Sequence, residues 1–228
     1  MVGTHREFKT PPDDTTVWRY MDLLKFVDLI STRDLFFSRL DTLEDKYEGY
    51  AHCDDLTTRY LRYNKYVNCW SIDDYESNAL WGIYGKGSSG SVAIKSTVGN
   101  VRQALNSCSY EIYIGEVNYE NGTDTIPKSK NFYSHVVNKR KYYAYEKELR
   151  LCVSSDDNSN PSPSCPHDKE IFCPDLNDKF MKIRIDLGAL IQEVYVSPSS
   201  EKWAIDAVKF VCKDVIDGSL INRSALVC

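Results

Sequence analysis

The chain has 228 residues, of which 42% are hydrophobic and 27% are charged, and its formal net charge is −5. This composition is that of a folded globular protein and excludes a chain that is disordered throughout. The acidic net charge argues against a generally basic DNA-binding surface, although a local basic patch is compatible with it. The length favours a single domain over 1–228, with a polar tail at 1–15 and a low-complexity loop at 154–175.

Residues 1–14 contain no apolar h-region, and no segment approaches 18 uninterrupted apolar residues. We therefore expect no signal peptide, no membrane span and a cytoplasmic location. The eight cysteines are spread along the chain and are expected to be reduced thiols. Cys165, His167 and Cys173 lack paired C-x-x-C spacing, so no metal site is expected.

The first half of the chain alternates between strand and helix patterns. Large and β-branched side chains predict a strand at 17–21. Asp22 is predicted to cap the helix that follows it, because apolar residues recur there at helical spacing. Later predicted elements are a strand at 35–38, a helix at 51–66, a strand at 67–72, a helix at 76–84 and a strand at 91–94.

The second half continues the alternation. A helix is predicted at 101–105, a strand at 110–119, a basic helix at 128–143 and a strand at 145–153. After the low-complexity loop come predicted strands at 180–185 and 193–196, a helix over 200–215 and a short strand near Leu220. The buried stripe of the helix over 200–215 is predicted to comprise Trp203, Ala207, Phe210 and Val211. Intermixed strands and helices without an internal repeat predict an α+β or mixed α/β fold.

The most informative stretch lies in the strand predicted at 145–153. Side chains alternate in a strand, so Glu146, Glu148 and Arg150 would share one face. Two neighbouring carboxylates shift each other's pKa apart, which suits acid–base chemistry or the stabilisation of a developing cation. A solvated edge strand with a Glu–Arg pair explains the same pattern without any function.

Four residues in the first half could hold a ligand. Arg19 is flanked by aromatic residues in a predicted strand, which suits contact with a phosphate or carboxylate, although a surface arginine fits equally well. Ser71 lies at a predicted strand end, where a hydroxyl can reach a ligand. Trp81 and Tyr84 are three residues apart on a predicted helix and either stack on a planar ring or belong to the core.

Two charged segments offer alternatives. Asp45 and Glu48 lie in an acidic loop that is either a polar turn or, with Glu146 and Glu148, part of a metal-dependent phosphodiesterase or nuclease. The basic segment at 128–141 either forms a solvated helix face or contacts nucleic acid, with its aromatic residues stacking on bases. The cations that would contact phosphates are Lys128, Lys130, Lys139, Arg140 and Lys141.

The order of these motifs resembles that of a widespread, largely uncharacterised microbial domain family. The motifs are Arg19-Tyr20, Cys69-Trp70-Ser71, Leu80-Trp81-Gly82-Ile83-Tyr84 and Tyr145-Glu146-Lys147-Glu148-Leu149-Arg150, and they cover residues 17–153. The same order resembles, more distantly, the ADP-ribosyltransferase superfamily, including DarT-type enzymes that modify nucleic acid. The second resemblance implies a split sheet flanked by helices and the transfer of ADP-ribose from NAD to a nucleic acid or protein, in a toxin or phage-defence setting.

The resemblance to ADP-ribosyltransferases also implies roles for individual residues. Arg19, with the adjoining Tyr20, and Ser71 would contact NAD, and Trp81 or Tyr84 would stack on its nicotinamide. Glu148 would stabilise the oxocarbenium-like transition state, and Glu146 would position the acceptor. One motif departs from the superfamily pattern, because Cys69-Trp70-Ser71 replaces the Ser-Thr-Ser of well-known members.

The residues themselves leave three functions open: an NAD-consuming transferase, a non-catalytic module that binds nucleic acid or a protein through an aromatic-lined groove, and the metal-dependent nuclease.

Overall fold

The structure is a computed structural model of the whole chain, and it describes residues 2–45, 48, 62–84, 90–120, 133–155 and 179–226. The chain divides into two compact units. The first comprises Met1–Thr10, Phe36–Cys69 and Cys108–Ile183, and the second comprises Pro11–Leu35, Trp70–Ser107 and Arg184–Cys228. Each unit mixes helices with parallel and antiparallel strand pairs, which confirms a mixed α/β architecture. The single domain over 1–228 and the ADP-ribosyltransferase-like split sheet remain predictions.

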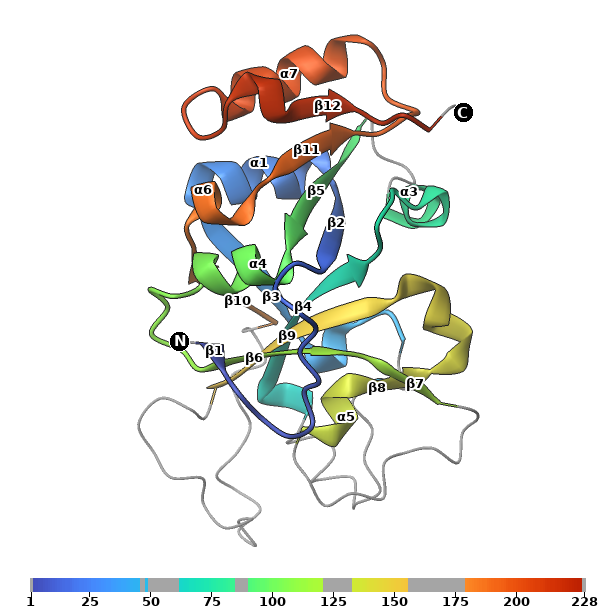
Figure 1. Cartoon of the computed structure of the whole chain (residues 1–228), viewed down its shortest axis with the longest axis vertical. Coiled ribbons are helices and arrows are strands. Elements are labelled where there is room, and N and C mark those ends of the chain that lie inside the picture. Colours follow the sequence, from blue (N-terminus) through green and yellow to red (C-terminus); the bar gives the residue numbers. More distant parts are fainter. Residues whose placement is uncertain are drawn as a thin grey trace, which may run out of the picture. The chain divides into compact units, whose positions relative to one another are not determined.

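The first unit is built on a sheet with strand order β1-β6-β9-β4-β3-β10 (Figure 1). These strands are β1 (Val2–Gly3), β3 (Asp34–Arg39), β4 (Lys65–Ile72), β6 (Ile112–Glu116), β9 (Glu148–Ser154) and β10 (Phe180–Arg184); β3, β4 and β10 each extend along the chain into the second unit. A separate parallel pair joins β7 (Asn118–Glu120) to β8 (Asn138–Arg140). The short helical segments are η1 (Leu40–Thr42), α5 (Ser134–Val137) and η3 (Lys141–Glu146).

Strand β9 is buried along its whole length, and the alternation of its side chains explains why it carries both core and polar groups. Leu149, Leu151 and Val153 alternate on one face and are fully buried. The opposite face carries Glu148 and Arg150, which are buried as well. Because a charge inside a protein needs a partner, this polar face requires matching charges from other segments.

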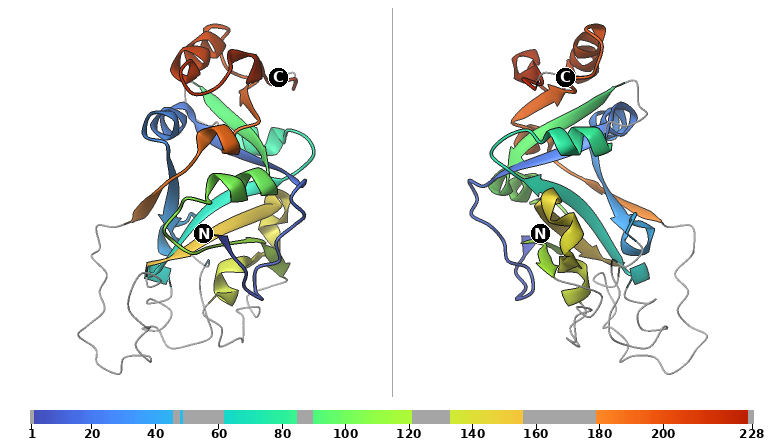
Figure 2. Two further views of the ribbon diagram at one scale, coloured as in Figure 1. Left: turned by 60° about the vertical axis from the view of Figure 1, so that its left-hand side comes forward. Right: turned by 90° about the vertical axis from the view of Figure 1, so that its right-hand side faces the viewer.

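The second unit is a sheet with strand order β4-β2-β5-β11-β12, to which only the end of β4 contributes. Its strands are β2 (Thr16–Asp22), β5 (Ser91–Thr97), β11 (Glu193–Val196) and β12 (Ile221–Arg223). Its helices are α1 (Leu23–Thr32), α3 (Asn78–Tyr84), α4 (Val98–Ala104), α6 (Leu187–Leu190), α7 (Trp203–Cys212) and the 3-10 turn η5 (Gly218–Leu220). Helices α1 and α4 pack on β5, α3 packs on β2, and α7 packs on β11 and β12 (Figure 2).

Helix α1 begins and ends as its sequence predicts. The Asp22 side chain accepts a hydrogen bond from the Lys25 backbone N–H at 2.8 Å, which satisfies one of the free donors of the first turn. The helix ends at Arg33, whose φ of 57° places it in the left-handed region and whose N–H donates to Leu29. Phe26, Leu29 and Ile30 are buried, as the helical spacing predicted.

Replacing Asp22 by alanine is expected to lower the free energy of unfolding by about 1 kcal/mol, because the first turn loses its capping oxygen. Asp22→Asn is the matched control, since asparagine retains that oxygen, and it should cost much less. Urea denaturation of the three proteins measures the difference. Equal losses in both variants would show that the charge at residue 22, and not the cap, stabilises the helix.

Most predicted elements are present, and the exceptions have local causes. The N-terminal residues do not form a free polar tail, because Val2–Gly3 pairs with β6 and Phe8 is buried. Gly115 permits this packing, since a Cβ at this position would lie 2.7 Å from the Phe8 Cα atom. The helix predicted at 51–66 ends earlier than predicted, because Arg62 and Tyr63 are helical but β4 already begins at Lys65. Residues 51–61 lie outside the described residues, as does most of the loop predicted at 154–175.

Two predictions for helices in the rest of the chain are also wrong. In the described part of 128–143 the helix is short, because α5 ends at Val137 and the chain continues into β8 and η3. In α7 the buried side chains are Ala204, Val208 and Cys212, whereas Trp203 and Phe210 are exposed. Small side chains let the helix approach the sheet closely, so the larger aromatic residues of the predicted stripe lie on the outer side.

No helix in the described part of the chain is long and apolar enough to cross a membrane. The four cysteines at described positions, Cys69, Cys108, Cys152 and Cys212, form no disulfide bond.

Candidate functional site

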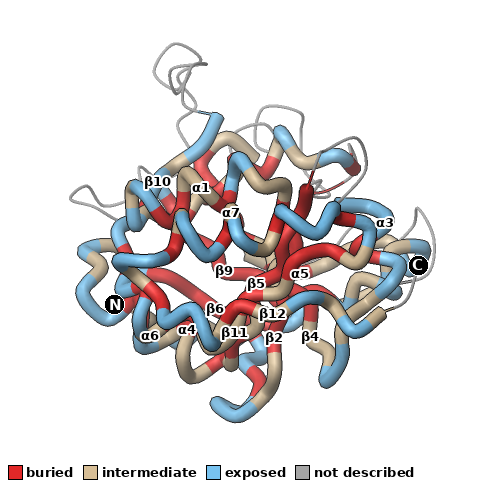
Figure 3. Tube along the Cα trace, turned by 90° about the horizontal axis from the view of Figure 1, so that it is seen from above, coloured by how far each residue is buried: buried red, intermediate tan, exposed pale blue. Residues whose placement is uncertain are grey.

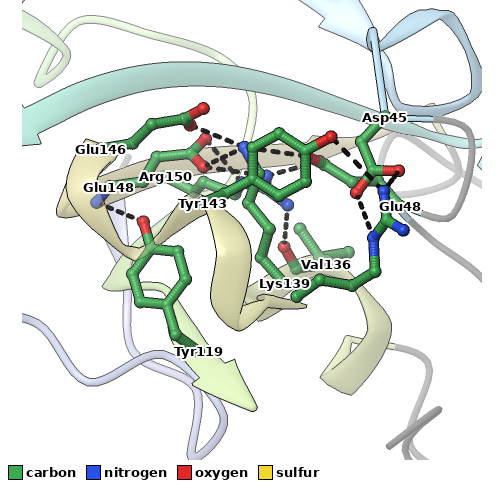
Figure 4. A network of polar contacts seen from close by, with 10 residues as sticks. Asp45, Glu48, Tyr119, Val136, Lys139, Tyr143, Glu146, Glu148 and Arg150 are labelled. Carbon is green, nitrogen blue, oxygen red and sulfur yellow. Dashed lines mark hydrogen bonds and ion pairs between the residues drawn. The ribbon is translucent and has the colours of Figure 1, made fainter. Parts of the chain in front are cut away.

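Five charged side chains of the first unit form a buried cluster, which we call the ion cluster (Figure 4). Its members are Glu48, Lys139, Glu146, Glu148 and Arg150. They come from a loop, from β8, from η3 and from the start of β9. The cluster therefore joins segments that are up to 102 residues apart in the sequence.

Arg150 is the most deeply buried member, with 0% of its side chain exposed. Its Nε and Nη2 groups donate to the two oxygens of Glu148 at 2.8 and 3.0 Å, a bidentate pair. Nη2 also donates to Glu48 at 2.5 Å, and Nη1 donates to the Val136 carbonyl at 2.6 Å. The guanidinium thus has partners on all three nitrogens, which is what its burial requires.

Lys139 lies among the three carboxylates. Its Nζ atom is 2.7 Å from Glu146, 3.0 Å from Glu48 and 3.2 Å from Glu148. An ammonium group has three donors, so one is available for each carboxylate. Burial alone would lower the pKa of Lys139, but the charges of Glu148 and Glu48 outweigh burial and raise it, so the ammonium stays protonated.

The two glutamates of β9 and η3 differ in environment. Burial would raise the pKa of Glu148, but Arg150 and Lys139 lower it to about 2, so this carboxylate stays ionised. Burial raises the pKa of Glu146, which Lys139 only partly opposes and the charge of Glu148 reinforces. Glu146 is also the most accessible of the three carboxylates, with 15% of its side chain exposed against 4% for Glu148.

The charges of the ion cluster do not balance. Three carboxylates face two cations, so the five side chains carry a net charge of 2 − 3 = −1 when all are ionised. Glu48 and Glu148 each contact both cations, and Glu146 pairs with Lys139. The member of this negatively charged cluster that lies nearest to solvent among the carboxylates is Glu146.

Neighbouring groups fix the borders of the cluster. The Tyr119 hydroxyl accepts a hydrogen bond from the Glu148 N–H at 2.8 Å, which anchors the first residue of β9. The Tyr143 ring centroid lies 4.8 Å from Lys139 Nζ. Arg140, which donates to the Tyr143 hydroxyl at 3.4 Å, binds both oxygens of Asp45 at 2.8 and 3.1 Å. Tyr142 and Tyr145 of η3 are exposed.

The backbone explains how Glu146 and Glu148 come to differ. The strand predicted at 145–153 begins only at Glu148, because Lys147 adopts the left-handed region with φ 43° and ends η3. Glu148 and Arg150 do share a strand face, as predicted. Glu146 is not on that strand, and it reaches the cluster from a 3-10 turn instead.

Sequence reasoning missed the central role of Lys139. It was predicted either on a solvated basic face or in contact with the phosphates of a nucleic acid, but only 8% of its side chain is exposed, because three carboxylates surround it. Arg140 is engaged with Asp45, whereas Lys141 is exposed. Lys128 and Lys130 lie outside the described residues. One feature of the sequence could have indicated this role. Glu148 and Arg150 lie in an otherwise apolar strand, and charges buried with such a strand need charged partners from other segments.

The carboxylates proposed for a metal-dependent nuclease are held by cations of the protein. Asp45 pairs with Arg140, and Glu48, Glu146 and Glu148 surround Lys139. Among the residues that the structure describes, no group of three or more His, Cys, Asp or Glu side chains is placed to hold a metal ion. Cys165, His167 and Cys173 are outside those residues.

The residues predicted to hold NAD all belong to the second unit, and two of them are in contact. The rings of Tyr20 and Trp81 meet edge to face, with centroids 5.0 Å apart, inside a buried apolar cluster. The Tyr20 hydroxyl accepts a hydrogen bond from the Ser77 N–H at 2.7 Å, and burial raises the pKa of Tyr20 to about 12. The Trp81 indole donates to Glu76 at 3.0 Å.

The other three lie on different elements of that unit. Arg19 is on β2, with its guanidinium carbon 6.0 Å from the centroid of the Trp70 ring. Ser71 is buried on β4, one residue before the strand ends. Tyr84 is the last residue of α3 and is 46% exposed, so it is more accessible than Trp81 for stacking on a ligand. Glu146 and Glu148 lie in the first unit.

Comparison of the chain with protein-family models, with curated proteins and with solved structures finds no match.

Proposed function

We propose that this chain transfers ADP-ribose from NAD to an acceptor and that the ion cluster provides the reacting carboxylate. The observation that carries the proposal is the contrast between Glu148, which is buried and ionised, and Glu146, which is more exposed and has a raised pKa. Two carboxylates whose environments push their pKa values apart are suited to two different roles in one reaction.

The reaction breaks the bond between the nicotinamide nitrogen and C1 of the ribose, and the bonding electron pair leaves with nicotinamide. Positive charge then develops on the ribose, and a fixed carboxylate stabilises it. Glu146 fits this demand, because it is the most accessible of the three carboxylates of the ion cluster. The acceptor atom bonds to C1 and loses its proton, and the raised pKa of Glu146 suits it to take that proton.

Glu148 acts in this proposal as a positioning residue. It holds Lys139 at 3.2 Å, and Lys139 in turn holds Glu146 at 2.7 Å. The small exposed fraction of Glu148 supports this assignment over direct contact with substrate. The roles in binding NAD that the resemblance implies for Arg19, Tyr20, Ser71, Trp81 and Tyr84 remain predictions, as does the choice between nucleic acid and protein as acceptor.

Glu146→Gln is expected to lower the rate of nicotinamide release by about 10²–10⁴-fold while leaving the fold intact. Glutamine keeps an oxygen for Lys139 but supplies neither the negative charge nor the base. Release is measured with NAD alone, in which case water is the acceptor, and with single-stranded DNA, RNA or protein added. Glu116→Gln is the matched control, because Glu116 is exposed at the end of β6 in the same unit.

The proposal fails if the wild-type protein neither binds NAD in a thermal-shift assay nor releases nicotinamide with any of these acceptors. It also fails if Glu146→Gln and Glu116→Gln retain equal activity. Circular dichroism of both variants separates a loss of chemistry from a loss of structure.

A further inference from the structure

Helix α7 of the second unit carries more apolar surface than its own unit covers. Ala204, Val208 and Cys212 are buried, and the helix contacts β11 and β12. A second apolar row, which we call the α7 seam, consists of Trp203, Ala207 and Phe210. Trp203 is 57% exposed and Phe210 is 70% exposed. Figure 3 shows exposed stretches along α7.

The spacing of the seam is that of one helix packing against another. Positions 203, 207 and 210 are four and three residues apart, so they form one stripe along a helix. Aromatic side chains of this size bury a large area when they are covered, and Trp is frequent among the residues that dominate binding energy at interfaces. The seam therefore has the form of a contact surface for a helix.

One side of the seam is basic. At about 100° per residue, Lys202, Lys209 and Lys213 project from the same flank of the helix. Lys202 and Lys213, the residues on either side of α7, have helical backbone angles, so the spacing of about 100° per residue applies to them as well. Lys213 Nζ lies 4.7 Å from the Phe210 ring centroid, which places a cation directly beside the aromatic row.

The net charge of this flank is opposite in sign to the net charge of the whole chain. Its three lysines are accompanied by one carboxylate, that of Asp206, whereas the whole chain carries −5. Glu201, two residues before the helix, lies toward the inner side of the helix at the same angular spacing, and Asp214, the residue after Lys213, lies in line with the seam. Together with Asp206, Asp214 leaves the three lysines with an excess of one positive charge, 3 − 2 = +1. An occupant of the seam would thus meet a net positive flank.

We propose that the α7 seam binds an acidic amphipathic helix of another protein. Apolar side chains of that helix would pack on Trp203, Ala207 and Phe210, and its carboxylates would face the lysine flank. Charge decides this choice of occupant. A second copy of α7, paired antiparallel, would bring two lysine flanks together, which is unfavourable. The inference concerns a surface of the second unit and does not depend on the proposed transferase activity.

The probe for this proposal is a synthetic helix of about 18 residues, or five turns, with leucine at positions spaced alternately three and four apart and glutamate at most others. The comparison probe has lysine in place of every glutamate. Binding of each to the full chain is measured by titration calorimetry at low and high salt. We expect the leucine–glutamate helix to bind, with an affinity that falls as salt rises, and the leucine–lysine helix to bind at least tenfold more weakly.

Two variants of the seam sharpen this test. Trp203→Ala with Phe210→Ala should weaken binding by at least about tenfold, and so should charge reversal at Lys202, Lys209 and Lys213. Tyr75→Ala is the matched control, because Tyr75 is an aromatic residue of the same unit that is 78% exposed and outside α7, and it should leave binding unchanged.

Four results would overturn the proposal. These are no binding of the leucine–glutamate helix, equal binding of both probes, an equal loss in Tyr75→Ala, and a dimer in analytical ultracentrifugation that the Trp203→Ala and Phe210→Ala changes dissociate. Preferential binding to phosphatidylserine vesicles over the leucine–glutamate helix would assign the seam to a membrane surface instead. Nicotinamide release is expected to be the same in all seam variants.

Discussion

Replacing Arg150 by methionine is expected to lower the free energy of unfolding by about 3–5 kcal/mol, because it leaves two buried carboxylates without one of their two cations. Glu48 and Glu148 both contact the guanidinium and are almost completely buried, so water cannot replace it. Methionine fills much of the same volume, and the loss therefore reports on charge and hydrogen bonding more than on a cavity. Urea denaturation at pH 7 measures it.

Arg184→Met is the matched control for this prediction. Arg184 also pairs with a carboxylate, at 3.2 Å from Asp34, but 67% of its side chain is exposed. Exposed ion pairs stabilise proteins by about 0–1 kcal/mol, so this variant should change little. Losses of similar size in both variants would contradict the conclusion that the carboxylates of the ion cluster are buried and ionised.

A combined variant distinguishes a cluster that stabilises the fold from one that is retained for function. Replacing Glu48, Lys139, Glu148 and Arg150 together by leucine or methionine removes the four most deeply buried charges of the ion cluster at once. Buried ion networks replaced by apolar residues of similar volume are often as stable as before. We expect the combined variant to be more stable than Arg150→Met alone and to release no nicotinamide. This result would show that the ion cluster is needed for activity and not for the stability of the fold.

The elements that could be predicted are those whose signals are local. Asp22 is followed directly by the apolar residues of α1, and this order predicts where the helix begins. The strand predicted at 193–196 has the same limits as β11 in the structure. The start of β9 could not be predicted, because Lys147 in the left-handed region carries no sequence signal of the kind that glycine would give.

The ion cluster shows a second limit of sequence reasoning. Alternation in the strand at 145–153 correctly places Glu148 and Arg150 on one face, but it says nothing about which distant cation or carboxylate will meet them. Lys139 was grouped with its basic neighbours, although its burial depends on Glu48, Glu146 and Glu148. Long-range pairing of charges is a property of the folded chain, and local pattern does not encode it.

Helix α7 shows a third limit, which concerns the phase of a helix. Hydrophobicity favours the stripe with the largest apolar side chains, Trp203 and Phe210, as the buried one. In the structure the sheet is covered by Ala204, Val208 and Cys212, because small side chains allow close packing. Both stripes are apolar, so composition alone cannot decide which of them faces inward.

Acid is expected to destabilise the first unit through Glu148, by about 3 kcal/mol between pH 5 and pH 2. The pKa of Glu148 is about 2 in the folded protein, against 4.5 as its ordinary value, because Arg150 and Lys139 outweigh the effect of burial. A depressed folded pKa gives stability that is present above the unfolded value and is lost as the pH falls through 4.5 toward 2.

Glu146 has the opposite effect on how stability depends on pH, and variants of Glu146 therefore serve as a control. Burial raises its pKa, so its folded form takes up a proton more readily than the unfolded chain, and protonation in acid partly offsets the loss from Glu148. Urea denaturation from pH 7 to pH 3 should therefore show a steeper loss in Glu146→Gln than in the wild-type protein. In Glu148→Gln the protein should be less stable at pH 7 and its stability should change less with acid. An unchanged acid dependence in Glu148→Gln would mean that carboxylates outside the ion cluster cause the loss, and that Arg150 and Lys139 do not hold Glu148 ionised.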